Sequence, residues 1–388
     1  MKKRNLILIA FICPMFLFSS CDSTETTSSS DVAEVTSIEE TSEISTIDSH
    51  TEMEEKLNLH YEIIDSKVSI TGVVDSEASS VLIPSMIEGY PVTKIATKSF
   101  CDCSKLTSIK IPEGVTSIGY EAFENCSSLS SISLPSTLTD LGKYCFFNCS
   151  KLESIDIPEN ITVINEYVFK SCSSLASVTF PAALTTIGDT SFEYCSSLTN
   201  VTIPANVTAI EDFAFYGCTN LKTIALPEGL ISLGKMAFSK CSAIEGITLP
   251  ETLNSLGDGV FQSCTGLKEI TLPASVTEIS GQMFYNCSSL TTVNLPDTLT
   301  SIETEAFNAC KSLGSIIIPG SVEYIGADAF YGCATTIFFN GSFENWSNAS
   351  DDSGIEDVAK VTVYTFSEET PTESGNYWHF VDDVPTIW

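Results

Sequence analysis

Cysteine is the residue type in this chain whose spacing could carry chemistry. The sequence holds 15 cysteines, and eleven of them recur at an interval of 23 residues. Thiols in an exported chain can form disulfides, and clustered cysteines can hold zinc. The eleven regularly spaced cysteines are at positions 103, 126, 149, 172, 195, 218, 241, 264, 287, 310 and 333.

The regular spacing disfavours both uses. Equivalent side chains of successive repeats point the same way, and eleven cysteines, an odd number, cannot all pair with one another. Because a free cysteine behaves as a small buried hydrophobic residue, we expect a ladder of buried thiols, with disulfides between some neighbouring repeats as the alternative. Cys101 and Cys145 fall outside this ladder. Zinc is disfavoured because Cys-x-Cys occurs once, at Cys101 and Cys103, with no histidine near it.

The three histidines, His50, His60 and His379, form no catalytic pattern. His379 stands near Asp382 and Asp383, which could suggest an acid–base pair, but no nucleophile accompanies them, and packing among aromatic neighbours is the expected role. The sequence contains no phosphate-binding loop, dinucleotide-binding glycine motif, HExxH motif or EF-hand. We therefore expect no catalytic, cofactor-binding or metal-binding residues, no cofactor and no enzyme activity.

The cysteines belong to a repeat of 23 residues, seen in the stretch from Cys126 to Asn148. Self-similarity at one short period is typical of a solenoid. Prolines keep the same interval at 112, 135, 158, 181, 204, 227, 250, 273, 296 and 319. Phenylalanines keep it at 100, 123, 146, 169, 192, 215, 238, 261, 284, 307 and 330, and we expect them to form a buried stack.

The apolar positions of one unit predict its local structure. Ile132 and Leu134 lie on one face of an extended strand, and Pro135 ends that strand because it has no N–H to donate. Leu138 and Leu141 then return the chain toward the interior. In six units a glycine follows this second residue, where we expect a tight or left-handed corner. The Ala-Phe step that comes next predicts one helical turn on the outer side.

Residues 1–21 match a bacterial lipoprotein signal peptide. Basic residues at 2–4 precede an apolar run from Leu6 to Phe18, followed by Ser19-Ser20-Cys21. This ending resembles a lipobox, with Phe18 where the motif usually has leucine. We expect Cys21 to carry the lipid, with ordinary secretion as the alternative. A transmembrane anchor is disfavoured because the run is shorter than about 20 residues and contains Pro14.

The rest of the chain divides into four parts. Residues 22–57 are rich in Ser, Thr and Glu and predict a disordered tether. Residues 58–83 predict a hairpin with Asp65-Ser66 at its turn, which caps the open end of the solenoid. Residues 84–335 hold eleven repeats of 23 residues, and residues 336–388 a degenerate last repeat with a C-terminal cap.

Charge excludes one class of partner. The chain has 50 acidic and 18 basic residues, a formal net charge of -32. Such a field repels nucleic acid and anionic membrane surfaces. We therefore expect no nucleic-acid partner, and membrane contact only through the N-terminal lipid.

The outward positions of the predicted strands are small and rich in hydroxyl groups. They contain no Trp, Tyr or Arg, the residue types that favour binding hot spots, so the ligand-binding residues stay unknown. Tyr194, Tyr216, Tyr285 and Tyr331 near the outer corner are candidates, although packing between coils is the commoner role. One row of outward positions is 110, 133, 156, 179, 202, 225, 248, 271, 294 and 317, and the other lies two residues before each of these.

The unit Cys-x-x-Leu-x-x-Ile-x-Ile/Leu-Pro-x-x-Val/Leu-x-x-Ile-Gly-x-x-Ala-Phe-x-x-Cys resembles the BspA-like, or Treponema pallidum-type, leucine-rich repeat over residues 84–335. The resemblance implies an α/β repeat solenoid, a right-handed coil with a parallel β-sheet on one face and short helical turns or irregular structure on the other. Proteins of this family are bacterial, and occasionally protist, surface proteins, some of them implicated in adhesion.

These observations predict a non-enzymatic bacterial cell-surface lipoprotein that mediates adhesion or protein–protein interaction. The expected partner is a host matrix protein or another cell-surface protein. A glycan-binding surface protein and a structural spacer without a specific ligand are the alternatives.

Overall fold

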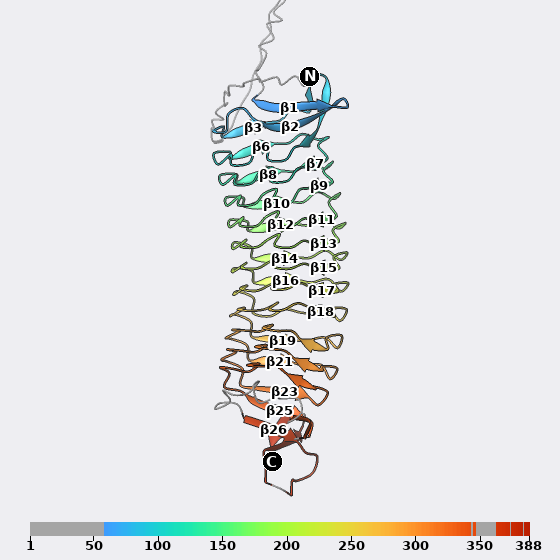
Figure 1. The fold of residues 1–388 in the computed structure, drawn as a ribbon, viewed down its shortest axis with the longest axis vertical. Coiled ribbons are helices and arrows are strands. Elements are labelled where there is room, and N and C mark those ends of the chain that lie inside the picture. The colour runs from blue at the N-terminus through green and yellow to red at the C-terminus, as the bar shows by residue number, and fades with distance from the viewer. Residues whose placement is uncertain (1–57, 343, 347–361, 373, 383) are drawn as a thin grey trace, which may run out of the picture.

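The computed structural model describes residues 58–342, 344–346, 362–372, 374–382 and 384–388. The expected signal peptide and tether lie outside these residues. The described chain winds into a stack of coils, with β1 at one end and the C-terminal strands at the other (Figure 1). Almost no helix is present in this part of the chain, apart from the short segment 344–346. The predicted solenoid is therefore confirmed.

The expected strand forms the first strand column of the stack in every unit except that of residues 246–248, where Gly246 makes only an isolated bridge to Glu269. The strand's middle residue points inward and its two flanking residues are exposed, as the apolar pattern predicts. The column consists of β3 (Ser80–Leu82), β6 (Ser108–Lys110), β8 (Ser131–Ser133), β10 (Ser154–Asp156), β12 (Ser177–Thr179), β14 (Asn200–Thr202), β16 (Thr223–Ala225), β19 (Glu269–Thr271), β21 (Thr292–Asn294), β23 (Ser315–Pro319) and β25 (Thr336–Asn340).

A second strand column, which the sequence pattern did not predict, runs beside the first in Figure 1. Its two-residue strands form where the second apolar pair of each unit returns the chain inward. It contains β7 (Ser117–Ile118), β9 (Asp140–Leu141), β11 (Val163–Ile164), β13 (Thr186–Ile187), β15 (Ala209–Ile210), β17 (Ser232–Leu233), β18 (Ser255–Leu256), β20 (Glu278–Ile279), β22 (Ser301–Ile302) and β24 (Tyr324–Ile325).

The phenylalanine of every unit is buried and stacks on its neighbours. Ring centroids of successive residues from Phe100 to Phe330 lie between 5.2 Å and 6.0 Å apart, with the rings close to parallel. Strands pair in parallel at an offset of 23 residues, as with Ile109 and Ile132, so the same side chain meets itself in each coil. The predicted phenylalanine stack is confirmed.

The glycines after the second column were expected at tight or left-handed corners, and the left-handed alternative is wrong. None of Gly119, Gly142, Gly188, Gly234, Gly257 and Gly326 has a positive φ. They allow close approach of neighbouring coils instead. A Cβ on Gly142 would overlap the carbonyl carbon of Gly119 and lie 2.5 Å from the backbone nitrogen of Tyr120.

The left-handed positions lie in the turns around the Ala-Phe step and are mostly filled by residues other than glycine. In the unit of Phe123 they are Glu121, with φ of 54°, and Asn125, with φ of 60°. The amide of Phe123 donates to the carbonyl of Cys145 in the next coil at 2.8 Å. Because the backbone bonds to the neighbouring coil, the expected helical turn is replaced by consecutive turns in the described coils.

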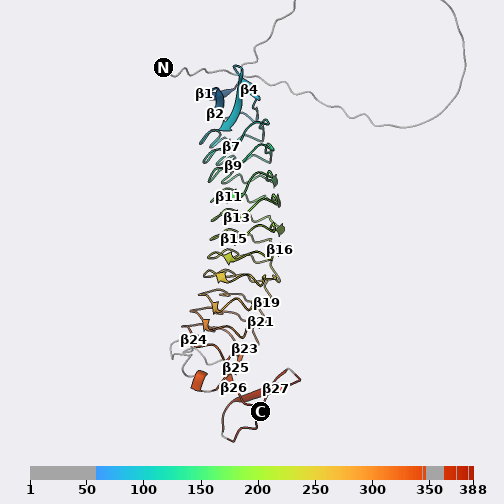
Figure 2. The ribbon, with the colours of Figure 1, turned by 90° about the vertical axis from the view of Figure 1, so that its right-hand side faces the viewer.

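Hairpins stand at both ends of the stack. At the N-terminal end, β1 (Leu59–Ile64) and β2 (Lys67–Val73) pair antiparallel, and Asp65 and Ser66 between them have positive φ, which forms the predicted turn. β2 pairs in parallel with β5 (Tyr90–Ile95), which also pairs antiparallel with β4 (Met86–Ile87). At the other end, β26 (Thr362–Phe366) leads into the antiparallel pair β27 (Tyr377–Val381) and β28 (Val384–Ile387). Figure 2 shows this pair at the C-terminal end of the stack.

The glycine contacts predict that Gly142→Ala lowers the free energy of unfolding by about 1–3 kcal/mol, because the added methyl group overlaps backbone that cannot move away. Urea denaturation followed by circular dichroism measures the change. Gly314→Ala is the matched control, since a Cβ there meets nothing within 4 Å and the φ of Gly314 is not positive. An equal loss in both variants would contradict this account of the coil spacing.

Candidate interaction surface

The cysteines of the ladder are buried, as predicted, and none of the described cysteines is in a disulfide. Each ladder cysteine from Cys126 to Cys333 donates its Sγ hydrogen to the backbone carbonyl of the phenylalanine 26 residues earlier. The distances lie between 3.0 Å and 3.2 Å, as for Cys126 with Phe100. These thiols therefore satisfy core carbonyls and are not available as nucleophiles.

Burial raises the pKa of the ladder thiols from Cys103 to Cys287, to about 12 for Cys172 and Cys264. At the end of the ladder, a thiol–thiol hydrogen bond raises the pKa of Cys310 and lowers that of Cys333. A raised pKa keeps a thiol protonated and unreactive at neutral pH. Cys101 is half-buried, and desolvation together with the neighbouring Asp102 raises its pKa to about 12 as well. Within the described part of the chain, no group of three or more His, Cys, Asp or Glu side chains is placed to hold a metal ion.

His379 lies in the C-terminal hairpin, where its ring packs against Trp388 with centroids 3.8 Å apart. Its backbone pairs with Thr386 across the hairpin. Asp382 is in the turn, with no hydrogen bond or ion pair to His379 among the described residues, and Asp383 lies outside them. His379 is thus a packing residue, which matches the role expected from its aromatic neighbours.

The outward positions of the first strand column form an exposed surface, which we call the strand face. Both predicted rows are exposed, from Ser108 and Lys110 to Ser315 and Ile317. For most of the stack these residues are small and polar. Ile317, 37% exposed, is the one large apolar side chain among the row positions from 110 to 317, and beyond Lys110 the row continues to Leu82, 52% exposed.

Beyond Ile317 the row becomes aromatic. Strand pairing places Phe338 next to Ile317, and Tyr364 next to Phe338. The rings of Phe338 and Tyr364 stack with centroids 5.8 Å apart, and Trp378 of the C-terminal hairpin packs on Phe338 at 5.4 Å. The hairpin therefore rests on the aromatic end of the row and leaves Ile317 uncovered beside it.

A hollow of about 360 Å³ lies where the strand face meets this hairpin. Its size is within the range of small binding sites. Ile317 and Pro385 supply apolar wall, while Thr292, Asn294 and Asp297 supply hydroxyl, amide and carboxylate groups. No lining residue is basic, so the hollow suits neutral or cationic groups better than anions.

The sequence pattern missed this hollow because Pro385 is far from Ile317 along the chain and outside the 23-residue period. The one signal was Ile317 itself, an isoleucine in a row of otherwise small or polar residues. The aromatic continuation was hidden because the last repeats change length: the pairing offset is 21 residues from β23 to β25 and 26 residues from β25 to β26.

The four tyrosine candidates lie in the turns between the second strand column and the ladder cysteines. Tyr194 and Tyr216 pack edge to face between neighbouring coils, with centroids 5.4 Å apart. This is the packing role that was expected, yet Tyr194 is 44% exposed and Tyr331 is 47% exposed. Packing and exposure therefore coexist on this side of the stack.

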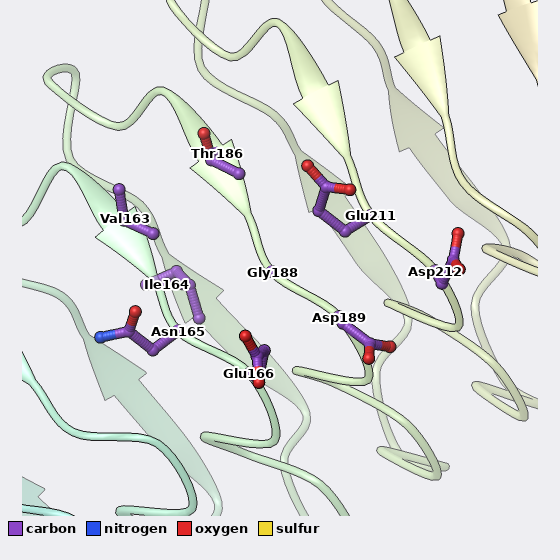
Figure 3. Close-up of a pocket in the computed structure, with 9 residues that line it drawn as sticks. All are labelled: Val163, Ile164, Asn165, Glu166, Thr186, Gly188, Asp189, Glu211 and Asp212. Carbon is purple, nitrogen blue, oxygen red and sulfur yellow. The ribbon is translucent and has the colours of Figure 1, made fainter.

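A second hollow, of about 350 Å³, lies on the second strand column between β11 and β15 (Figure 3). Four carboxylate side chains line it, from Glu166, Asp189, Glu211 and Asp212. Lys143 pairs with Glu166 at 2.7 Å, and Asp212 accepts a hydrogen bond from the backbone N–H of Lys235 at 2.7 Å. The hollow is strongly acidic.

The repeat unit and its coil match a known family. The family described as the BspA type leucine rich repeat region (6 copies) matches residues 93–222, 185–313 and 277–372. These overlapping matches cover more than half of the chain. The chain belongs to the BspA-type leucine-rich repeat family. The resemblance inferred from the repeat unit is thereby confirmed, and a comparison with curated proteins finds no match.

Solved structures give a similar result. A leucine-rich repeat protein from Bacteroides ovatus is 27% identical, with 79% of this chain and 98% of that chain covered and a TM-score of 0.57. A leucine rich cell surface protein from Faecalibacterium prausnitzii is 29% identical, with coverages of 76% and 97% and a TM-score of 0.48. The T. pallidum leucine rich repeat protein is 31% identical, with coverages of 54% and 88% and a TM-score of 0.41.

The thiol ladder predicts a loss of stability at alkaline pH. An unfolded thiol has a pKa near 8.5, while burial raises the native pKa, so above about pH 8.5 the unfolded chain releases protons that the native protein keeps. The free energy of unfolding must therefore fall as the pH rises from 9 toward 12. Urea denaturation with reductant at several pH values measures it.

Cys145→Ala isolates the contribution of one thiol, because alanine fills the same position at Ala122 and Ala214. Cys145 is fully buried and burial raises its pKa well above the usual value. Between pH 8 and 10 the variant should lose about 2 kcal/mol less stability than the parent protein. Identical pH dependence in both proteins would contradict the assignment of protonated buried thiols.

Proposed function

We propose that this leucine-rich repeat protein is a non-enzymatic, lipid-anchored bacterial surface protein that binds a protein partner through the C-terminal end of its strand face. The expected partner is a host matrix protein or a protein of another cell surface. The observation that supports this most directly is the hollow beside Ile317, where an uncovered apolar side chain meets a rim of hydroxyl, amide and carboxylate groups.

An apolar centre within a polar rim is the usual composition of a protein–protein interface. Between Lys110 and Ile317 the strand face offers this composition at one place, because the other residues of the row are small or polar there. The row's other large exposed apolar side chain, Leu82, lies next to Lys110 at the opposite end of the stack. The overhanging hairpin adds a second wall through Pro385. A partner side chain that enters between the strands and the hairpin would bury Ile317 without moving the coils.

Glycan binding is the second candidate function. The hollow combines neutral hydrogen-bonding groups with apolar wall, which also suits a polyhydroxylated ligand, and its volume of about 360 Å³ is large enough for a small one. The rings next to it are covered, since Phe338 is only 9% exposed under Trp378. The lack of an open aromatic platform here makes protein the better-supported ligand.

Binding of the protein without residues 1–21 to immobilised matrix proteins and to a glycan array separates the alternatives. We expect saturable binding to a protein. Binding to glycans alone would favour the second function, and no binding to either would support a structural spacer and contradict the proposal.

Ile317→Thr tests the site itself. Threonine stands at the same row position at 179, 202, 248 and 271, so the variant should fold normally. We expect its affinity for the protein partner to fall about tenfold or more, since it removes the uncovered apolar side chain. Thr202→Ala, which copies Ala225 of the same row, is the matched control and should bind normally. Unchanged binding by Ile317→Thr would place the interface elsewhere.

The lipid anchor is tested by metabolic labelling of the full chain with a lipid analogue in a bacterial host. Cys21 follows the expected signal segment, so the full chain should take up label and Cys21→Ser should not. An unlabelled parent protein would show ordinary secretion instead.

A further inference from the structure

Seven aromatic side chains line the turns of five consecutive coils on the side away from the first strand column. We call this group the tyrosine strip. It consists of Tyr120, Tyr144, Phe147, Tyr167, Tyr194, Phe213 and Tyr216. The strip is distinct from the phenylalanine stack, which is buried, because each of its members is exposed or half-buried.

The fold does not require aromatic residues at these positions. Tyr144, Tyr167 and Phe213 occupy the first left-handed position of their turns. In the other coils the same position holds Lys98, Glu121, Thr190, Met236, Gly259, Gln282, Glu305 or Asp328, with φ values between 53° and 63°. The turn therefore forms equally with polar side chains, and the aromatic ones need another explanation.

The rings contact one another in two groups. Tyr144 and Tyr167 stack with centroids 4.4 Å apart and planes 5° apart, and Tyr120 meets Tyr144 at 5.7 Å. Tyr194 and Tyr216 form the second group, in edge-to-face contact. Tyr120 and Tyr194 are the outermost rings, 42% and 44% exposed. Exposed tyrosines held by neighbouring rings are typical of protein-binding hot spots.

Two rings of the strip already bind cations. The ammonium of Lys170 lies 5.3 Å from the ring centroid of Tyr167, and that of Lys240 lies 4.8 Å from the ring centroid of Tyr216. Both distances are within the range of cation–π attraction. The pKa of Lys240 is raised by its hydrogen bond to Tyr216, as expected for a surface that favours positive charge.

Carboxylates surround the strip. Glu166 and Asp212 line the acidic hollow (Figure 3), and they directly precede Tyr167 and Phe213 in the chain. Of the four carboxylates that line the hollow, Glu166 is paired with a lysine, Lys143. Asp189 accepts a hydrogen bond from a neutral group, the hydroxyl of Thr190, at 2.6 Å. Most of the negative charge of the hollow is therefore not compensated. The chain as a whole carries a net charge of -32, which attracts basic proteins over longer distances.

We propose that the tyrosine strip and the acidic hollow beside it form a docking surface for an arginine- and lysine-bearing segment of a protein partner. Arginine fits both features, because its planar guanidinium stacks on aromatic rings and binds a carboxylate through two parallel hydrogen bonds. Because Tyr144 and Lys170 already contact the ring of Tyr167, the exposed rings of Tyr120 and Tyr194 are the ones open to a guanidinium. A sugar ring fits less well, since it has no positive charge to pair with the carboxylates of the hollow. This surface is separate from the hollow at Ile317, so each can be tested without the other.

The test uses the protein without residues 1–21 and a 12-residue synthetic peptide that contains four arginines. Counterpart peptides carry four lysines or four glutamines in their place. Fluorescence anisotropy at physiological salt measures affinity. We expect the arginine peptide to bind best, the lysine peptide more weakly and the glutamine peptide not at all, because only the first can make both stacking and paired hydrogen bonds.

Variants separate the strip from diffuse charge attraction, because they leave the net charge unchanged. We expect binding of the arginine peptide to weaken about tenfold or more in a triple variant that combines Tyr144→Thr, Tyr167→Thr and Tyr216→Asn. The substitutes come from the same repeat positions, Thr190 and Asn308. Tyr285→Asn with Tyr331→Asn, at the repeat position of Tyr216 but outside the strip, is the matched control and should bind within twofold of the parent protein.

A measurement on the unsubstituted protein tests the proposal even where a variant fails to fold. Hydroxyl-radical footprinting should show protection of Tyr120 and Tyr194 by the arginine peptide, and none of Tyr331, which is equally exposed. Equal loss of binding in the strip and control variants, or equal binding of the arginine and glutamine peptides, would overturn the proposal. Glycan binding that disappears in the strip variant while the arginine peptide fails to bind would assign the strip to sugars instead.

Discussion

The whole structure depends on the close approach of neighbouring coils. Each coil pairs its backbone with the next one, including the amide of the core phenylalanine, which donates to a carbonyl one coil further on. This pairing holds only if the coils lie at strand spacing, about 4.8 Å. Glycines such as Gly142 allow that spacing where a Cβ would meet backbone, and the phenylalanine rings stack through the interior with centroids slightly further apart, 5.3 Å for Phe123 and Phe146. The buried thiols add a contact between coils by donating to phenylalanine carbonyls that also accept a backbone N–H of their own turn.

Because these contacts repeat, the regular spacing of cysteine, proline and phenylalanine describes structure, and recognition must use the positions that vary between units. Two such places stand out. At the C-terminal end of the strand face, one isoleucine interrupts a row of small residues beside an overhanging hairpin. On the turn side, aromatic residues replace polar ones in five consecutive coils next to an acidic hollow. One surface offers an apolar pocket and the other a broad cation-binding strip.

The sequence alone predicted the solenoid, the first strand column, the phenylalanine stack and the buried thiols, because each depends on a residue type that recurs at one interval. It did not predict the second strand column, since two-residue strands leave little alternation to detect. It misjudged the role of the glycines, because close backbone approach depends on the neighbouring coil and not on the local turn. The hollow at Ile317 could not be predicted, because Pro385, which forms part of its wall, belongs to the C-terminal hairpin outside the 23-residue period. The tyrosine strip was partly visible at Tyr194 and Tyr216, but its other members occupy different positions within the unit and share no single period.

Since every internal coil makes the same contacts above and below, removal or addition of one 23-codon unit by recombination leaves all the ladders in register. Such an event between the turn-side strip and the hollow at Ile317 would change their separation by about 4.8 Å and alter neither surface. The distance between the two surfaces is thus set by a whole number of repeats, independently of the residues that form either surface.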